Sequence, residues 1–425
     1  MDEDFSNRLL GIGKPLKPVV NQVRVLHLLR TGGPLSRADI ARHTLLTKAT
    51  ASRIIAHLLD RNLVREVGVR SLRRGRRPVL YEFNTASAIA LGVEVREESC
   101  QAVVAELDAT PLRSYAYPLP DTLVGTFISV LEQIIAAVRQ EFSQQLVGIG
   151  IGIPGIFDYR RQTVVLAEHL EWANVELVKL IRERTGLSAY VVNRANAAAL
   201  GEKWYGAGRG RDDLVFITIG AGIKAGIVIG GELYWGSNGS AGEIGHMTVT
   251  PDGPPCLCGK RGCLEALASV NAILERVRGL IRAGRSEALA ARYGPGGEDL
   301  NRPGLLQEAE AGDPIVTEAL REAATYIGIG VANMINICNP ERVILGGLAS
   351  EAPPVFADTI RRVAQAHAFS ISQQATDIVV AELGRDAVAI GAAALLLSDF
   401  LQPTQNSRSL AGPYAYNELL VTAAN

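Results

Sequence analysis

The sequence has few cysteines and no long apolar run. Only five of its 425 residues are cysteine, an odd number without the spacing of a disulfide framework. This excludes a disulfide-stapled secreted scaffold and favours a reducing compartment. No apolar stretch approaches the roughly 20 residues that span a bilayer, and the opening MDEDFSNRLLGIGK is acidic where a signal peptide is basic. We therefore expect a cytoplasmic protein with no membrane partner.

A large net charge is also absent, because 43 Lys and Arg nearly balance 44 Asp and Glu. The balance is uneven along the chain: residues 1–83 carry 16 basic and 7 acidic residues, and the rest carry 27 and 37. A basic first domain on an acidic body indicates that the first domain alone meets a polyanion. The length and the 48% hydrophobic content predict two or three globular domains.

Three helices with short connections are predicted in the basic region. They are expected at residues 18–33, 36–44 and 47–64. Apolar residues recur at helical spacing in the first and third, and Ser36 with Asp39 three residues later forms a capping-box pattern. About three residues separate the second helix from the third, as a helix-turn-helix requires.

A wing is predicted after these helices, because residues 63–84 contain two short β-prone runs around an arginine-rich turn. The segment RGRRP resembles minor-groove hooks, in which glycine lets the backbone enter a narrow groove and arginines favour its negative potential. Small and hydroxyl residues at the start of the third helix allow close approach to base edges. We predict DNA contacts from Ser36, Arg37, Thr47, Lys48, Thr50, Ser52, Arg53, Arg70, Arg73, Arg74, Arg76 and Arg77. The alternative is a three-helix protein-docking module with a solvated arginine loop.

From about residue 85 the sequence has an α/β pattern. LVGIGIGIPGIF (146–157) predicts a buried strand, and DLVFITIGAGIKAGIVIGGELYWG (213–236) predicts two strands around a Gly-rich turn. SAYVVNRANAAALGEKWYG (188–206) predicts a strand, a turn at 193–196 and a helix, and AVAIGAAALLL (387–397) a closing helix. Two β-rich halves joined by helices predict two lobes with a cleft between them.

Six motifs resemble the ROK family of repressors, uncharacterised frames and sugar kinases, over nearly the whole chain. They are GIPG at 152–155, NRANAAALGE at 193–202, GAGIKAGIVIGGELYWG at 220–236, AGEIGH at 241–246, CLCGKRGCLE at 256–265 and NPERVILGG at 339–347. With the predicted winged helix in front, the chain is most similar to the repressor branch, in particular to xylose repressors.

The resemblance implies an α/β fold with an N-terminal winged helix-turn-helix and a two-lobed actin/hexokinase-like (ribonuclease H-like) body, with the sugar in the cleft. The expected domains are 1–84 for DNA binding, 85–196 for the first lobe with a closing helix at about 386–400, 197–385 for the second lobe with a zinc knuckle and a dimerisation surface, and 401–425 for a C-terminal extension without an assigned role.

The features that a kinase of this family needs are altered. Glu94 replaces the Asp of the first phosphate loop, and the following residues are bulky and charged. Arg194 stands where the family has its catalytic Asp, and a guanidinium is always protonated and cannot be that base. The second phosphate loop loses its hydroxyl and gains Lys224, which we interpret as a solvated turn lysine, with a phosphate contact as the alternative. We therefore predict that the chain is not an enzyme.

The sugar-binding positions of the family are better kept. The resemblance implies hydroxyl contacts from Asn193, Glu243, His246 and Glu265, with close backbone approach at Gly155. Asn193 and Gly155 have purely conformational alternatives, and the two glutamates have a surface alternative. Arg194 also enters this set: it donates to hydroxyls, pairs with Glu243 or Glu265, or selects an acidic ligand, and the sequence does not rank these.

His246, Cys256, Cys258 and Cys263 match the zinc pattern of the family. Three thiolates and one imidazole fill a tetrahedral shell and leave no position for an activated water, so the predicted Zn²⁺ is structural. The alternative is four loop residues without a metal. Cys100 and Cys338 are expected as core thiols.

These observations predict a sugar-responsive transcriptional regulator, a repressor of carbohydrate-metabolism genes at the nucleoid. We expect it to bind a palindromic DNA operator as a homodimer, with a tetramer as the alternative, and a small carbohydrate effector to change the spacing of the DNA-binding domains. One alternative is a ROK sugar kinase with a regulatory DNA-binding head. Another is a ligand-free regulator gated by a protein partner.

Overall fold

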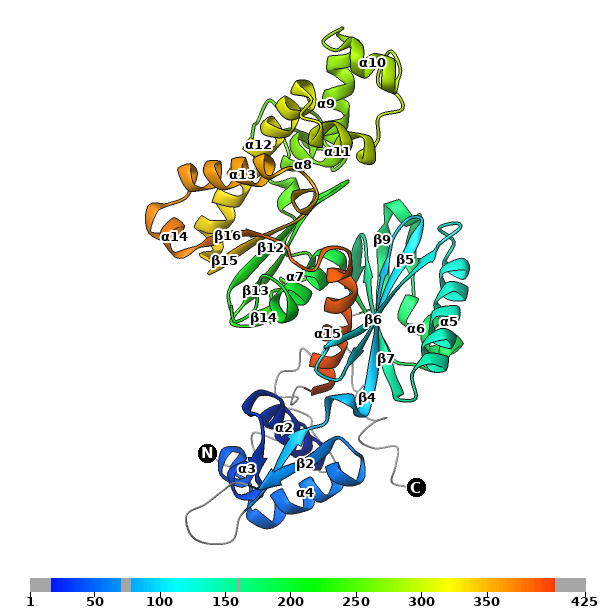
Figure 1. Cartoon of the computed structure of the whole chain (residues 1–425), viewed down its shortest axis with the longest axis vertical. Coiled ribbons are helices and arrows are strands. Elements are labelled where there is room, and N and C mark those ends of the chain that lie inside the picture. The colour runs from blue at the N-terminus through cyan, green and yellow to red at the C-terminus, as the bar shows by residue number, and fades with distance from the viewer. Residues whose placement is uncertain (1–16, 70–77, 159–160, 402–425) are drawn as a thin grey trace. The chain divides into compact units, whose positions relative to one another are not determined.

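The computed structural model describes residues 17–69, 78–158 and 161–401, and Figure 1 shows the order of its elements. The chain divides into two compact units. One comprises the described residues up to Val192 together with those from Ala392, and the other is Asn193–Gly391. The sequence placed the boundary between lobes four residues later, after position 196, and assigned the whole closing helix to the first lobe.

The N-terminal part of the first unit is a winged helix. Its elements are α2 (Lys17–Gly32), β1 (Leu35–Ser36), α3 (Arg37–Thr44), α4 (Lys48–Asp60), β2 (Val64–Val69) and β3 (Val79–Phe83). The strands form an antiparallel sheet in the order β1-β3-β2. Three residues connect α3 to α4, which confirms the predicted helix-turn-helix connection. The buried side chains of α4 are Ala51, Ile54, Ile55 and Leu58, at the helical spacing read from the sequence.

The rest of the first unit is built on a five-stranded sheet in the order β11-β7-β4-β5-β6. Its strands are β4 (Ala88–Val95), β5 (Ser99–Glu106), β6 (Pro111–Pro118), β7 (Gln145–Ile153) and β11 (Ala189–Asn193). A small antiparallel sheet is formed by β8 (Ile156–Asp158), β9 (Thr163–Ala167) and β10 (Trp172–Val175). The helices are α5 (Val124–Glu141) and α6 (Leu177–Thr185), with 3-10 turns η2 (Thr85–Ser87) and η3 (Glu168–Leu170).

The second unit has a five-stranded sheet in the order β14-β13-β12-β15-β16. Its strands are β12 (Leu214–Ile219), β13 (Ile223–Ile229), β14 (Glu232–Leu233), β15 (Arg342–Gly347) and β16 (Asp377–Val380). Its helices are α7 (Arg194–Tyr205), α8 (Leu264–Ala268), α9 (Val270–Arg282), α10 (Glu287–Tyr293), α11 (Arg302–Glu310), α12 (Pro314–Cys338), α13 (Pro354–His367) and α14 (Ser370–Ala375), and α15 (Ala387–Leu401) begins here and ends in the first unit. The 3-10 turns are η4 (Ile244–His246), η5 (Leu348–Ser350) and η6 (Gly384–Asp386).

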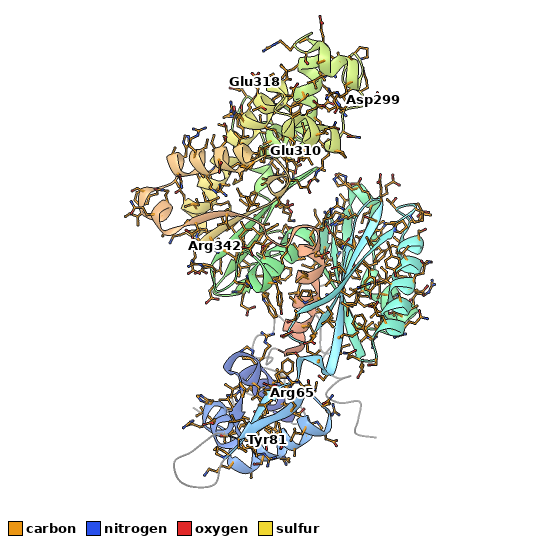
Figure 2. All side chains as sticks on the ribbon, viewed as in Figure 1. Arg65, Tyr81, Asp299, Glu310, Glu318 and Arg342 are labelled. Carbon is orange, nitrogen blue, oxygen red and sulfur yellow. The ribbon has the colours of Figure 1, made fainter. Side chains whose placement is uncertain are left out.

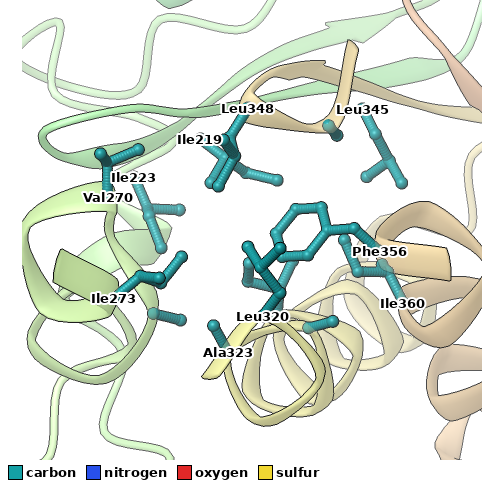
Figure 3. Close-up of a cluster of buried hydrophobic side chains, with 14 of the residues drawn as sticks. Ile219, Ile223, Val270, Ile273, Leu320, Ala323, Leu345, Leu348, Phe356 and Ile360 are labelled. Atoms are coloured by element: carbon teal, nitrogen blue, oxygen red, sulfur yellow. The ribbon is translucent and has the colours of Figure 1, made fainter. Parts of the chain in front are cut away.

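The core of the second unit lies between its sheet and the helices α9, α12 and α13. Figure 3 shows Phe356 of α13 among Leu320 of α12, Leu345 of β15 and Ile360, all fully or almost fully buried. Burying side chains of this size stabilises the fold by about 1.5–3 kcal/mol each. The long helix α12 is fixed at its start by Asp313, whose Oδ1 accepts the N–H groups of Ile315 and Val316.

The two five-stranded sheets share one topology. In each, three consecutive antiparallel strands are followed by a fourth strand that pairs in parallel with the first, as β4 does with β7 and β12 with β15. This repeated order confirms the two-lobed α/β body predicted from the sequence. Among the described residues, none of the helices has the length and apolarity needed to span a membrane.

Candidate functional site

The outward face of α4 is the candidate DNA-reading surface. Thr47 caps the helix by accepting the N–H of Thr50, and the two hydroxyls are 2.9 Å apart. Lys48 and Arg53 are exposed, and Ser52 is partly exposed. Ala49 and Ala56, which sequence reasoning did not select, are also exposed. They lie four residues before and three residues after Arg53, on the same face of the helix. Small side chains there leave the helix backbone open to close approach.

The other predicted DNA contacts differ in placement. Ser36 is buried and its hydroxyl completes a capping box with Asp39, accepting the Asp39 N–H at 3.2 Å. Because this hydroxyl is buried and used in the cap, it is not available to contact a DNA base, and we omit Ser36 from the proposed surface. Arg37 is exposed, with its guanidinium 5.1 Å from the ring centre of Tyr81, which Figure 2 labels on β3. The predicted wing contacts Arg70, Arg73, Arg74, Arg76 and Arg77 lie outside the described residues.

The junction of β11 and α7 carries Asn193 and Arg194. The sequence predicted a turn at 193–196, which is wrong, since the strand ends at Asn193 and the helix begins at the next residue. Asn193 is buried and its Oδ1 accepts the N–H of Ala195 at 2.9 Å, so the amide caps the helix. Arg194 is partly buried at the first helical position. A cation there lies at the positive end of the helix dipole, which destabilises the helix by about 0.3–1 kcal/mol.

Lys224 and Glu243 form an ion pair in the second unit. Lys224 lies on β13, Glu243 directly precedes η4, and the lysine ammonium donates to Glu243 Oε1. Only 16% of the Lys224 side chain is exposed. The prediction of a solvated turn lysine is therefore wrong, because the turn ends before β13 and the side chain is held by a carboxylate. The predicted sugar ligand Glu243 thus has a cationic neighbour that sequence reasoning missed.

Glu265 lies in the first turn of α8 and faces the start of β13. Its Oε2 accepts the N–H of Ile223 at 2.9 Å. Glu265 thus contacts Ile223, and Glu243 contacts Lys224, the next residue of β13. His246 ends η4, three residues after Glu243. The structure therefore gathers three of the predicted sugar-binding residues around one end of β13.

The four predicted metal ligands are brought together. One ligand atom from each of His246, Cys256, Cys258 and Cys263 lies within 4.8 Å of the others. The His246 Nδ1 is 3.7 Å from the Cys256 sulfur, and the Cys258 and Cys263 sulfurs are 3.6 Å apart. A disulfide requires about 2.05 Å, so these cysteines are not bonded in pairs.

The cluster fits a tetrahedral metal ion. Bonds of about 2.0–2.3 Å to nitrogen and sulfur set neighbouring ligand atoms about 3.5–3.8 Å apart, and the His246–Cys256 and Cys258–Cys263 separations agree with this spacing. The surrounding loop is tight, with positive φ at Gly259 and Gly262, and a Cβ at Gly262 would lie 1.5 Å from the Thr250 carbonyl oxygen. Burial, followed by the neighbouring thiols, raises the pKa of Cys263 to about 12. A bound cation would have to drive its ionisation.

In the first unit, the structure accounts for Gly155 and Glu94 by local contacts. Gly155 has φ +100°, and a Cβ there would lie 2.2 Å from the carbonyl oxygen of Leu166, so the packing of β8 on β9 alone requires glycine. A sugar contact at Gly155 stays a prediction. Glu94 is 1% exposed and accepts two hydrogen bonds from the Arg96 guanidinium, at 3.0 and 2.6 Å. Its carboxylate is thus compensated by a cation of the same chain.

Comparison with known families gives two matches along the chain. A model described as the ROK family matches residues 90–399. A model described as the MarR family matches residues 15–76, which include the described elements from α2 to β2 of the winged helix.

Individual proteins match over most of the chain. A xylose repressor of Caldicellulosiruptor bescii is 32% identical over 90% of this chain and 96% of its own length. An N-acetylglucosamine repressor of Escherichia coli is 28% identical over 89% and 92%.

Two solved structures extend the comparison. A ROK family transcriptional regulator, homologous to the Escherichia coli MLC protein, has a TM-score of 0.78 at 27% identity and covers 93% of this chain and 98% of its own. A ROK family glucokinase from Streptomyces griseus, in complex with glucose and AMPPNP, has a TM-score of 0.64 at 30% identity and covers 72% and 99%.

Proposed function

Because this chain belongs to the ROK family, we propose that it is a sugar-responsive, DNA-binding transcriptional regulator that represses carbohydrate-metabolism genes. The observation that carries the proposal is the union, in one chain, of a winged helix-turn-helix and a complete two-lobed body. The glucokinase relative covers only 72% of the chain, whereas the regulators cover about 90%. Their names support a carbohydrate effector, with xylose as the first to test.

We propose a palindromic operator bound by a homodimer, since one recognition helix reads a half-site and two copies read both. We propose that it acts in the cytoplasm, at the nucleoid, because its proposed partner is DNA. The effector would lie against Glu243, His246 and Glu265, where carboxylates accept from sugar hydroxyls and discriminate strongly when buried. A structural Zn²⁺ held by His246 and the three cysteines would fix this wall. The knuckle supports that role because its first and last ligands, His246 and Cys263, lie three residues after Glu243 and two residues before Glu265.

The sugar kinase is the second candidate, favoured only by the likeness to the glucokinase. Against it, we propose that the phosphoryl-transfer machinery is lost. Arg194 cannot accept a proton from a sugar hydroxyl, and Glu94 is occupied by Arg96. We expect no ATP binding in the micromolar range and no phosphorylation of any hexose or pentose. Calorimetry with ATP and a coupled kinase assay would measure both, and turnover would establish the kinase instead.

The proposed function is tested by combining a ligand panel with operator binding. Thermal shift against pentoses, hexoses, amino sugars and sugar acids should identify an effector that raises the unfolding temperature. Fluorescence anisotropy with DNA from the upstream region of the chain's own gene should then give an affinity that this effector changes. If no carbohydrate stabilises the protein, the sensor role is wrong. If specific DNA is not preferred over random DNA, the regulator role is wrong.

Glu265→Gln is expected to weaken effector binding about 10- to 150-fold, the value of a hydrogen bond to a charged group. The amide oxygen can still accept from the Ile223 N–H, so the backbone contact and the metal content should be unchanged. Calorimetry with the effector and metal analysis would measure the two separately. Glu310→Gln removes an exposed glutamate of α11 as the matched control. Equal affinities for the two variants would remove Glu265 from the pocket.

A further inference from the structure

The turn between α3 and α4 contains an exposed leucine in a strained backbone conformation. Leu45 directly follows α3 with φ +58° and ψ +23°, in the left-handed region that disfavours residues with a Cβ. Six other non-glycine residues in the described part of the chain have positive φ, and each of them is polar or alanine. Glycine or asparagine is the usual residue in this conformation at a helix end. A large apolar residue there lowers the stability of the winged helix relative to glycine.

The contacts of Leu45 within the chain do not compensate for this strain. Its backbone N–H donates to the Ala41 carbonyl oxygen, a bond that any residue except proline could make. The residue is 89% exposed, so packing of its side chain contributes little to the fold. Among the exposed large apolar residues of the described chain, only Leu257 is more exposed, at 96%. The folded chain alone therefore gives no reason for leucine at position 45.

Leu45 lies beside the surface that we propose to read DNA. It is two residues before Thr47, the N-cap of α4, and three residues before Lys48, the first residue of that helix. Lys48 and Ala49 are exposed next to it in the sequence. In a helix-turn-helix, the N-terminal residues of the second helix contact base edges in the major groove. Leu45 is therefore at the end of α4 that would enter the groove.

We infer that Leu45 is a specificity-determining residue that packs against a thymine methyl group of the operator. The major groove presents hydrogen-bond donors and acceptors and one apolar group, the 5-methyl of thymine. A leucine side chain has no polar atom, so the methyl is the group of a base edge that it matches. The contact removes the exposed side chain from water, which offsets in the complex the strain that the free protein carries. The inference rests on the proposed function, in which α4 reads DNA.

Leu45→Gly removes the side chain and the strain together, so stability and DNA binding should not change in the same direction. The unfolding temperature of the full-length protein should equal or exceed the wild-type value. Affinity for DNA from the upstream region of the chain's own gene should fall about 10- to 100-fold, the value of burying a leucine. The slope of log affinity against log salt should stay the same, because no charge is removed. Thermal unfolding and fluorescence anisotropy would measure these quantities.

Three further variants separate the apolar contact from other effects. Leu45→Asn tolerates the left-handed conformation but is polar, so it should lose affinity as Leu45→Gly does. Leu45→Met keeps an apolar side chain and should retain most of the affinity. Leu123→Asn is the matched control, because Leu123 is 66% exposed and lies outside the winged helix. It should bind the upstream DNA as the wild type does.

The partner group is tested with the same upstream DNA in which every thymine is replaced by uracil. This DNA lacks the methyl groups and keeps the hydrogen-bonding groups of each base. The wild type should bind it more weakly than the normal DNA. Leu45→Gly should lose less affinity on the replacement than the wild type does, because its methyl contact is already absent.

The outcomes distinguish this inference from the proposed function. A wild type that does not prefer the upstream DNA over random DNA would overturn the proposed function. A wild type that prefers it, with folded Leu45→Gly and Leu45→Asn variants that bind equally well, would overturn the inference about Leu45 alone. Equal sensitivity of the wild type and Leu45→Gly to the uracil replacement would also overturn it. A lower unfolding temperature of Leu45→Gly would show a structural role for the leucine and contradict the inference.

Discussion

Cys258→Ser is expected to abolish zinc retention, from one ion per chain to nearly none, and to remove the effector response with it. A structural zinc contributes about 10–16 kcal/mol of apparent binding free energy at neutral pH. Loss of one of its four ligands removes most of this binding free energy. The cluster joins two segments of the site. His246 lies three residues after Glu243, and Cys263 lies directly before the helix that carries Glu265. Loss of the ion therefore frees both proposed sugar-contact segments at once.

Metal analysis, calorimetry with the effector and DNA binding would follow the three consequences separately. The winged helix has its own sheet and core, so DNA binding should persist while the effector no longer alters it. Cys338→Ser is the matched control, because this thiol lies outside the cluster. Zinc retained by the Cys258 variant would exclude that residue from the ligand set. Effector binding that survives loss of zinc would show that the knuckle does not shape the pocket.

Local signals account for what could be predicted from the sequence. The helix-turn-helix follows from a capping box at Ser36 and a three-residue connection, both of which act within a few residues. The metal cluster follows in the same way, because its four ligands lie within 18 residues and their spacing limits where they can go. Such short-range patterns depend little on tertiary packing, so they can be recognised in the sequence.

Contacts between distant segments were missed for the opposite reason. Lys224 looked solvated beside glycines, yet packing of η4 on β13 brings the carboxylate of Glu243 to it from 19 residues away. Asn193 was assigned to a turn because asparagine is favoured both in turns and at the N-cap of a helix, and the sequence does not distinguish the two. Ile229 and Ile337 are apolar residues near the ends of β13 and α12, and only the assembled unit shows that both stay half or more exposed.

Replacing Arg73, Arg74, Arg76 and Arg77 by alanine is expected to weaken operator binding on the order of 10²- to 10³-fold at about 0.2 M salt. Each lost phosphate contact removes about 0.9 from the slope of log affinity against log salt, so the slope should fall by up to about 3.6. These residues lie outside the described part of the chain, and the sequence alone places them between β2 and β3, whose antiparallel pairing forms the base of the wing. Anisotropy titrations from about 0.05 to 0.3 M salt would give both quantities.

The control must remove the same charge elsewhere. Arg139, Arg182, Arg209 and Arg362 are exposed in the body, and their replacement by alanine changes the net charge by the same four units. If the wing reads DNA, only the first set should flatten the salt dependence, and discrimination between operator and random DNA should fall with it. Equal losses in both sets would assign the effect to overall charge. An unchanged slope in the wing variant would leave α4 as the sole DNA contact and would make the arginine turn a solvated loop.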